Sequence, residues 1–435
     1  MDYLPNILFA IILIAGIGFF TKNVKKLIRN IKLGQDVNVS DNKAQRWKNM
    51  TMIALGQSKM VRRPIAGVLH IVVYVGFIII NIEVLEIIID GLFGTHRIFS
   101  SAGSVYGFLI ASFEILAVLV IVAVVVFWIR RNILKLARFW KNEMTSWPKN
   151  DANYILYFEM VLMTLFLVMN ATDVQFQNMN SGNAISQFIA PIFSNLQESS
   201  LHLIERTAWW IHIIGILVFL NYLYYSKHLH ILLAFPNTFY GKLTPQGQFN
   251  NLASVTKEVK MMMDPNVDPF AAPPAGAESE VPAKFGASDV LDLNWVQLLN
   301  AYTCTECGRC TSECPANKTG KKLSPRKIMM DTRDRLEEVG KNIDTNKGAF
   351  KEDGKQLLDN YITREELWAC TSCNACVEAC PVSIDPLSII VEMRRYLVME
   401  QSAAPTELNT MMTNIENNGA PWPYNQMDRL NWKNE

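Results

Sequence analysis

The sequence carries little charge for its length, and it has no cysteine in its first 300 residues. Only 19% of its 435 residues are charged, and the formal net charge is +1. This balance argues against a protein that wraps nucleic acid and against a disordered chain of high net charge. The sequence also contains neither G-x-G-x-x-G nor G-x-x-x-x-G-K-S/T, so it offers no evident site for flavin or NAD(P)H.

In place of charge, the part of the sequence before residue 236 has five long apolar stretches. A helix needs about 20 residues to cross a hydrocarbon core of roughly 30 Å. The stretches that approach or exceed this length are Leu4–Phe20, Pro64–Ile89, Val105–Ile129, Asn153–Met169 and Ala208–Tyr225. We do not interpret the first as a secretory signal peptide, because it lacks both a basic n-region and a small-residue cleavage site.

Basic residues are concentrated in alternate loops between these stretches. The segment Lys22–Arg63 contains eleven Lys and Arg and Arg130–Lys149 contains six, whereas the other two loops contain one each, Arg97 and Arg206. Short loops rich in Lys and Arg remain on the cytoplasmic side of a membrane. The pattern therefore predicts a multi-pass protein of the cell inner membrane, with its N-terminus outside and everything after Tyr225 in the cytoplasm.

Ionisable residues interrupt some of the apolar stretches. Glu83 lies in the outer half of the second stretch and Glu114 in the third. A charged group at membrane depth is costly, so both are candidates for a quinone site or a proton path. The alternative is that they pair with the backbone or with water.

Four of the six histidines, His70, His212, His228 and His230, belong to or adjoin the apolar stretches. Neutral imidazoles from two helices can hold haem iron inside a bundle. His70 and His230 come from different spans at the same, cytoplasmic level, which is the arrangement of a b-type haem with two histidine ligands, although His228 could replace His230. Alternatively, His228 and His230 belong to an interfacial basic cluster and His70 is a hydrogen-bonded interior residue.

A second haem would need His212, which lacks an obvious histidine partner. If the last helix continues past Tyr225, His212 and His230 share one face, because eighteen residues make five helical turns. Five spans with histidines eighteen apart on the last one resemble the cytochrome b (gamma) subunit of respiratory nitrate reductase, over residues 1–236. That family has a second histidine where this chain has Ile80, so the resemblance implies the inner pair His70 and His230.

All eight cysteines lie in two runs with the spacing C-x2-C-x2-C-x3-C-P. The first run is Cys304, Cys307, Cys310 and Cys314, and the second is Cys370, Cys373, Cys376 and Cys380. Structural zinc sites usually separate two C-x2-C pairs, whereas this run is the bacterial ferredoxin signature for a [4Fe–4S] cluster. In two-cluster ferredoxins each fourth cysteine binds the other cluster, which predicts Cys380 with the first three cysteines and Cys314 with the second three.

Helix-favouring segments surround the runs, so the sequence predicts an all-α protein with a five-helix transmembrane bundle and an all-helical ferredoxin domain. The predicted divisions are a membrane domain over 1–236, a Pro/Ala-rich linker over 237–289, the dicluster domain over 290–400 and a partner-docking tail over 401–435. The stretch LWACTSCNACVEACPVSIDPLSIIVEMRR resembles the dicluster subunit of heterodisulfide reductase and the iron–sulfur subunits of succinate dehydrogenase-type enzymes. This resemblance implies a soluble partner with cysteine-rich CCG domains.

Together these features predict an electron-transfer subunit of a quinone oxidoreductase complex. Two [4Fe–4S] clusters and at least one haem b would connect a cytoplasmic CCG-domain iron–sulfur subunit or flavoprotein with the membrane quinone. One alternative is a ferredoxin held by an inert membrane anchor, without haem or quinone chemistry. Another is an ion or solute conduit that responds to redox change. The direction of electron flow is not in the sequence.

Overall fold

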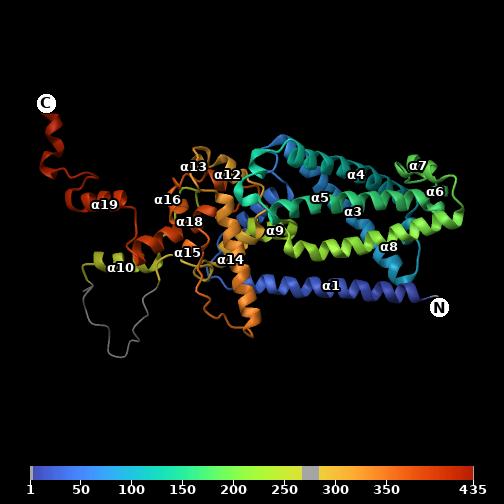
Figure 1. The fold of residues 1–435 in the computed structure, drawn as a ribbon, viewed down its shortest axis with the longest axis horizontal. Coiled ribbons are helices and arrows are strands. Elements are labelled where there is room, and N and C mark those ends of the chain that lie inside the picture. Colours follow the sequence, from blue (N-terminus) through green and yellow to red (C-terminus); the bar gives the residue numbers. More distant parts are fainter. Residues whose placement is uncertain (1–2, 267–283, 435) are drawn as a thin grey trace.

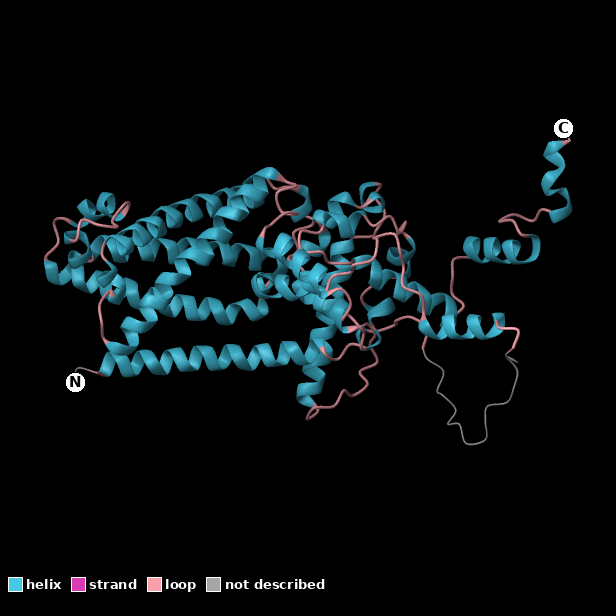
Figure 2. Ribbon diagram, turned by 180° about the vertical axis from the view of Figure 1, so that it is seen from behind, coloured by secondary structure: helices cyan, strands magenta, loops and turns pink. Residues whose placement is uncertain are grey.

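The computed structural model describes residues 3–266 and 284–434, and within these ranges every named element is a helix (Figure 2). A long bundle of apolar helices carries a smaller helical domain at one end (Figure 1). The predicted all-α fold, with apolar helices followed by a helical cysteine-containing domain, is therefore confirmed. Residues 267–283 of the predicted linker lie outside the described ranges.

Five long helices form the bundle. They are α1 (Leu4–Ile31), α3 (Pro64–Phe93), α4 (Ser104–Trp128), α5 (Trp147–Thr172) and α8 (Glu198–Tyr222). Three of them begin with a proline in the first turn, where its fixed φ favours helix and no hydrogen bond is lost. Each helix is long and apolar enough to cross a membrane, which indicates a multi-pass membrane protein.

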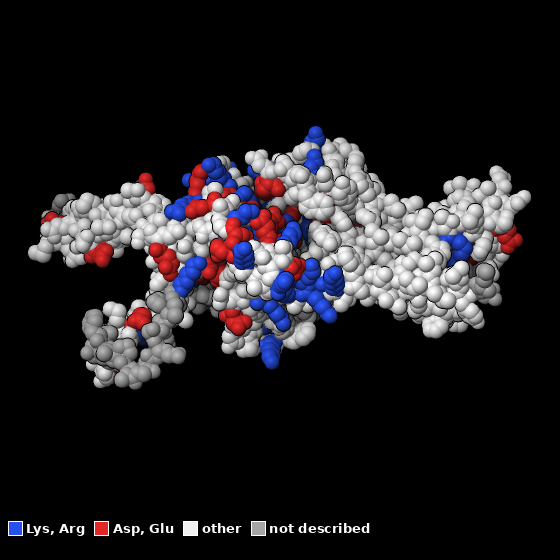
Figure 3. All heavy atoms as spheres, turned by 60° about the horizontal axis from the view of Figure 1, so that its bottom comes forward, with Lys and Arg blue, Asp and Glu red and all other residues white. Residues whose placement is uncertain are grey.

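The outward faces of these helices are apolar. Large side chains such as Ile11, Val68, Phe108 and Val161 are exposed, and one face of the bundle is almost without charge in Figure 3, where Lys, Arg, Asp and Glu gather over the smaller domain and the junction. An apolar surface of this kind is stable against lipid but not against water.

The shorter helices lie in the loops and in the smaller domain. They are α2 (Lys43–Met50), α6 (Val174–Asn178), α7 (Ser186–Ile189), α9 (His230–Phe239), α10 (Ala253–Met263), α11 (Trp295–Thr303), α12 (Arg309–Glu313), α13 (Pro315–Lys318), α14 (Pro325–Thr345), α15 (Leu357–Asn360), α16 (Arg364–Trp368), α17 (Ala375–Ala379), α18 (Pro386–Arg395) and α19 (Thr406–Asn418). The helices expected between and after the two cysteine runs correspond to α14, α16 and α18.

The cysteine-containing domain packs directly on the bundle. Leu27 of α1 and Leu223, just beyond α8, share one hydrophobic core with Leu298 of α11. In addition, Arg29 donates to the carbonyl of Gly340 at 3.0 Å. The two parts are therefore held together by a common core as well as by the chain that connects them.

The last long helix does not continue to His230. It ends at Tyr222, and Ser226 adopts extended backbone angles of φ −110° and ψ 149°. The Ser226 hydroxyl accepts from the amide of His228, and α9 begins at His230. The condition for His212 and His230 to share one face, a helix that continues past Tyr225, is therefore not met, because Ser226 offers the backbone a local cap that ends the helix.

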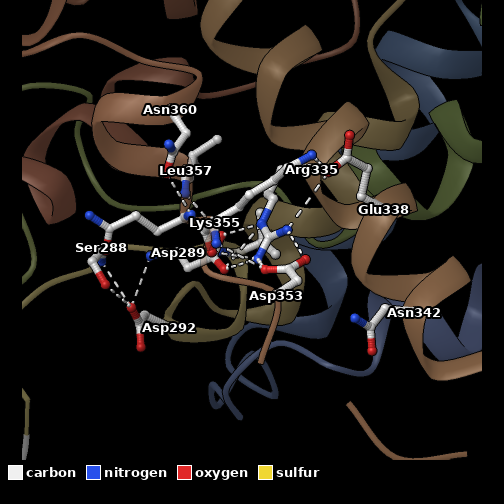
Figure 4. Close-up of polar contacts among 12 residues, drawn as sticks. Ser288, Asp289, Asp292, Arg335, Glu338, Asn342, Asp353, Lys355, Leu357 and Asn360 are labelled. Carbon is white, nitrogen blue, oxygen red and sulfur yellow. Dashed lines mark hydrogen bonds and ion pairs between the residues drawn. The ribbon is translucent and has the colours of Figure 1, made fainter. Parts of the chain in front are cut away.

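One buried arginine connects the 55-residue segment between the two cysteine runs with the start of the domain (Figure 4). Arg335 of α14 is fully buried and binds the carboxylates of Asp289 at 2.8 Å and Asp353 at 2.7 Å. It also donates to the carbonyl of Lys355 at 2.7 Å. Desolvation opposes its charge, but these acidic partners raise the pKa of Arg335 above its ordinary value. This network fixes the long insertion against the start of the domain.

Candidate functional site

The two cysteine runs fold in the same way. In each run the residue before the second cysteine and the residue after it have positive φ, and the third cysteine then enters a short helix, α12 or α17. The matching positions are Glu306 (φ 53°) with Ser372 (φ 57°) and Gly308 (φ 70°) with Asn374 (φ 59°). The two short helices pack against each other. The two runs, which have the same cysteine spacing, therefore also have the same backbone geometry. In each run the backbone folds around its own sulfur atoms.

The eight thiols divide into two groups in space. One pocket is lined by Cys304, Cys307, Cys310 and Cys380, which combines three cysteines of the first run with the last of the second. The thiols of Cys370 and Cys314 act electrostatically on Cys376, and those of Cys314 and Cys373 act on Cys370. The pocket thus joins the two runs, and the electrostatic contacts link Cys314 of the first run with cysteines of the second.

The chemistry of these thiols fits metal ligation. Burial raises the pKa of Cys304 to about 12 and that of Cys380 to about 11. A thiolate at these positions therefore needs a compensating positive charge, which iron supplies. Backbone amides also face sulfur atoms, from Ile384 to Cys380 at 3.3 Å and from Ser372 to Cys370 at 3.4 Å, and such bonds tune cluster potentials.

Charged side chains join the first run to the loops of the bundle. Glu306 forms an ion pair with Lys227 at 2.5 Å, and Arg309 donates to the carbonyls of Lys59 and Met60, both at 3.2 Å. Desolvation opposes ionisation of Glu306, but Lys227 and Arg333 lower its pKa to about 2. The first run is therefore fixed to the two loops that precede α3 and follow α8.

A fully buried arginine joins the same run to the third loop at this end. Arg326 of α14 donates to the carbonyl of Arg138 at 2.6 Å and binds Glu143 at 2.7 Å. Burial lowers the pKa of Arg138, which lies near Cys307, to about 10. All three loops at this end of the bundle thus contact the first cysteine run or its neighbours.

The structure brings His70 and His230 together. Their ring centres are 6.4 Å apart, with the planes tilted by 39°. His230 Nδ1 lies 3.0 Å from the carbonyl of Lys227. Since the carbonyl only accepts, the proton is on Nδ1 and Nε2 keeps its lone pair. Nδ1 of His70 is buried without a hydrogen-bond partner.

This pair passes a simple geometric test for a shared metal ion. Two imidazoles that each bind one ion at a metal–nitrogen distance of about 2 Å have ring centres roughly 6 Å apart, close to the 6.4 Å between His70 and His230. The hydrogen bond from His230 to Lys227 is of the kind that orients a ligating histidine. The separation of the two rings therefore matches the spacing of two imidazoles that bind one metal ion from opposite sides.

The other two candidate histidines lie in different surroundings. The ring centre of His228 is 5.3 Å from that of His230, and its Nε2 lies 3.4 Å from the carboxylate of Glu159. His212 is buried in α8 with its ring 6.4 Å from that of Phe166, and its Nδ1 has no hydrogen-bond partner. The two remaining histidines lie beside carboxylates, His96 beside Asp173 and His202 beside Glu205. The structure thus brings His230 close to both His70 and His228 and gives His212 no histidine partner.

The two membrane glutamates lie in different surroundings. Glu114 accepts from the side-chain amide of Asn170 at 3.0 Å and from the backbone amides of Ile185 at 2.7 Å and Ser186 at 3.0 Å. It holds the α6–α7 loop. Glu83 lines a cavity, and its Oε2 is buried without a partner. Of the two candidates, Glu83 is the one with a free oxygen beside an open volume.

Several residues of this site are not among those predicted from the sequence. Glu306 and Arg309 stand between the cysteines of the first run, and a charged residue at such a position was a usable signal. Tyr106 and Arg326 gave no comparable signal, since a tyrosine in an apolar stretch and an arginine in a helix are common. Their positions depend on contacts between segments far apart in the sequence.

Comparison with known families supports the cysteine chemistry. Residues 303–384 match the family described as 4Fe-4S dicluster domain. The domain therefore binds two [4Fe–4S] clusters through its eight cysteines. No solved structure matches the chain.

Several curated proteins are similar to the chain. A probable iron-sulfur-binding oxidoreductase, FadF, of Bacillus subtilis is 29% identical over 99% of this chain and 61% of its own length. The EtfAB:quinone oxidoreductase of Syntrophomonas wolfei is 25% identical over 92% of this chain and 55% of its own length. One subunit of the ferredoxin/F(420)H(2)-dependent CoB-CoM heterodisulfide reductase of Methanosarcina acetivorans is 32% identical over 27% of this chain and 60% of its own length.

The chain thus spans little more than half the length of the first two relatives. The resemblance to heterodisulfide reductase is supported by these matches, whereas the resemblance of residues 1–236 to a nitrate reductase subunit has no support in them and stays a prediction. The fold, the family match and the relatives together identify a membrane-anchored iron–sulfur electron-transfer protein with a dicluster ferredoxin domain.

Proposed function

We propose that the chain is a membrane-bound subunit that carries electrons between a soluble redox partner and the membrane quinone pool. In this proposal, two [4Fe–4S] clusters act together with one haem b whose iron is bound by His70 and His230. The observation that carries the proposal is the proximity of two imidazoles from different helices, whose ring centres are 6.4 Å apart. The haem would supply a one-electron carrier inside the bundle.

The side chain of Arg309 lies near both sites. Its charge acts on Cys307 and Cys380 and also on His70. This shared neighbour supports placing the histidine pair on the same side of the domain as the first cysteine pocket.

We assign the cluster ligands across the two runs. Cys304, Cys307, Cys310 and Cys380 bind the first cluster, and Cys370, Cys373, Cys376 and Cys314 bind the second. The shared pocket supports the first set, and the mutual electrostatic interactions of the second set support the other. Cys373 is an exposed cysteine, so the second cluster is the one that a soluble partner reaches.

We place the cysteine-containing domain on the cytoplasmic side. The basic loops Lys22–Arg63 and Arg130–Lys149 meet at this end of the bundle, as the distribution of positive charge in membrane proteins requires. The docking segment for the soluble partner is the tail 401–435, whose Trp422 and Trp432 are exposed. A relative whose name includes EtfAB favours a flavoprotein partner, and the heterodisulfide reductase relatives favour a CCG-domain subunit.

The test is a reduced-minus-oxidised absorption spectrum of the purified full chain. We expect a b-type α-band that disappears in His70→Ala and in His230→Ala. His228→Ala removes a neighbouring imidazole, whose ring centre is 5.3 Å from that of His230. It should keep the band, because Nε2 of His228 lies 3.4 Å from the carboxylate of Glu159. The electron paramagnetic resonance signals of both clusters should remain in all three variants, which shows that the domain is folded.

The contrary result is a wild-type chain without any haem band but with both cluster signals. That result would favour a membrane-anchored ferredoxin, the description carried by a relative from Chromohalobacter salexigens that is 32% identical over 34% of this chain and 24% of its own length. A band that survives in His70→Ala and vanishes in His228→Ala would instead move the iron to another pair of ligands.

A further inference from the structure

A cavity of about 200 Å³ lies between α3, α4 and the turn of 3-10 helix at Ile98–Ala102. Its walls are mainly apolar, and the polar groups that it contains include Glu83, Glu86 and Tyr106. This volume is smaller than a pocket for a whole drug-sized ligand. It suits a single planar ring system whose apolar tail extends out of the protein.

The cavity lies at the end of the bundle that is far from the cysteines. Glu83 follows His70 by thirteen residues of α3, which is about 20 Å along the helix axis. The start of α1 meets the end of α3 here, since Asn6 donates to the carbonyl of Gly91 at 2.8 Å. In Figure 1, α6 and α7 lie at this end and α12 lies beyond the opposite one.

The two carboxyl groups in the cavity differ in their hydrogen bonds. Glu86 is held on both oxygens, by the backbone amide of Phe99 at 2.9 Å and by the hydroxyl of Tyr106 at 3.1 Å. Glu83 is only 3% exposed, and its Oε2 has no partner. A buried oxygen without a donor is costly, so a ligand hydroxyl would complete its hydrogen bonding.

A network of charges connects the cavity with the surface at this end. Arg97 donates to the Tyr106 hydroxyl at 3.2 Å and to Asp173 at 2.7 Å. Asp173 in turn lies 3.2 Å from His96. Desolvation opposes the charge of Arg97, but Tyr106 and Asp173 raise its pKa. Arg97 therefore stays cationic and holds Tyr106 and Asp173 in place.

Exposed residues line the cavity on two sides. Ile82, which lines it, is 43% exposed on the apolar outer face of α3, so a tail can reach lipid. Ser101 and Ala102 line it as well and are exposed beyond the helix ends, so protons can reach water.

We propose that this cavity binds the head group of a quinone, with Glu83 as its proton acceptor and donor, and that quinone protons are exchanged at the end opposite the clusters. This inference rests on the proposed function and adds the site and its side of the membrane. When a quinol is oxidised, its two O–H bonds break, each proton passes to Glu83 and then to water at this end, and two electrons pass singly to the iron–sulfur clusters. Quinone reduction is the reverse. Electron transfer through the chain thus moves charge across the membrane.

The first experiment measures binding and turnover with the full chain in detergent. Menadiol supplies the head group without a long tail, and ferricyanide is the electron acceptor. We expect Glu83→Gln to weaken menadione binding and to lower menadiol oxidation at least tenfold, while both cluster signals persist. Glu198→Gln is the matched control, since Glu198 is exposed at the start of α8, at the same end of the bundle, and should behave as wild type.

The second experiment uses vesicles that contain the chain, a pH dye inside and ferricyanide, which does not cross membranes, outside. Protease removal of a C-terminal tag identifies the molecules whose cluster domain faces outward. Menadiol oxidation by these molecules should acidify the vesicle interior. Acidification only of the outside, or normal menadione binding and turnover in Glu83→Gln, would overturn the inference but leave the proposed function intact. A wild-type chain that does not react with menadiol would overturn both.

Discussion

The two cysteine runs share one backbone but not one environment. The first run is fixed to the bundle loops by Glu306 and Arg309, and its pocket lies among Arg63, Arg138 and Arg309. The second run has the exposed Cys373. Its close arginines are Arg394, which donates to the carbonyl of Cys370 at 2.5 Å, and Arg62, which forms an exposed ion pair with Glu378. The repeat has therefore been adapted, one copy to the membrane domain and the other to the surface.

This difference has consequences for the direction in which electrons move most easily. Positive charge near a cluster favours its reduced state, and its potential depends on charge and solvent exposure. Each cluster has a carboxylate near one ligand, Glu306 near Cys304 and Asp385 near Cys376. Glu306 is paired with Lys227, however, and the first cluster has more arginine around it. We therefore expect the first cluster to have the higher potential, so that electrons that enter at the second cluster pass to the first.

The largest expected effect comes from removing a ligand of either cluster. Cys307→Ser and Cys373→Ser should each lower the iron content from about eight to about four atoms per chain, because one [4Fe–4S] cluster is lost. The fourth cysteine of each run gives a second test, because we assign it to the cluster of the other run. Cys380→Ser should remove the same paramagnetic signal as Cys307→Ser, and Cys314→Ser the same signal as Cys373→Ser. The opposite pairing would disprove the crossed assignment.

The next effect concerns the ion pairs that fix each run to the bundle. Lys227→Met leaves the buried carboxylate of Glu306 with one cation fewer. Because a buried ion pair is broken, we expect the free energy of unfolding to fall by about 3–5 kcal/mol. Arg62→Gln removes the exposed pair with Glu378 of the second run, for which we expect at most about 1 kcal/mol. Thermal unfolding in detergent measures both. Equal losses of stability would show that the two runs are held to the bundle in the same way.

A smaller effect is expected at the matching turn positions Gly308 and Asn374. Both have positive φ, but a Cβ at Gly308 would lie 2.5 Å from Nη1 of Arg326 and 3.3 Å from Arg138. We expect Gly308→Ala to destabilise the domain by about 1–3 kcal/mol and Asn374→Ala by roughly 1 kcal/mol. Loss of cluster absorbance during thermal unfolding reports both, and a larger effect of Asn374→Ala would contradict the close packing at the first run.

The smallest effect is a shift in potential. Arg309→Gln removes a positive charge near Cys307 and Cys380 and should lower the potential of the first cluster by tens of millivolts. A unit charge several ångströms away contributes about 1–2 kcal/mol at an effective dielectric constant of about 20. Redox titration followed by paramagnetic resonance measures this shift. The second cluster should not move, and a shift of both by the same amount would contradict the separate environments.

Much of the architecture could be predicted from the sequence. The five spans have a length and hydropathy that only a membrane-spanning helix explains, and the two cysteine runs have a spacing that only a few metal centres use. The pairing of His70 with His230 was predicted from their common depth. These are local or periodic properties, which the chain carries without reference to its neighbours.

Other features depend on contacts between distant segments. The break at Ser226, which separates His212 from His230, arises because Ser226 caps the following turn, and helical spacing alone did not reveal it. Glu83 and Glu114 are both glutamates in apolar stretches, yet loop amides occupy Glu114 and leave Glu83 with a free oxygen beside a cavity. The residue types and their spacing specify which chemistry the chain carries. Which groups have partners and which remain available depends on the folded chain, because burial and hydrogen bonding involve residues that folding brings together.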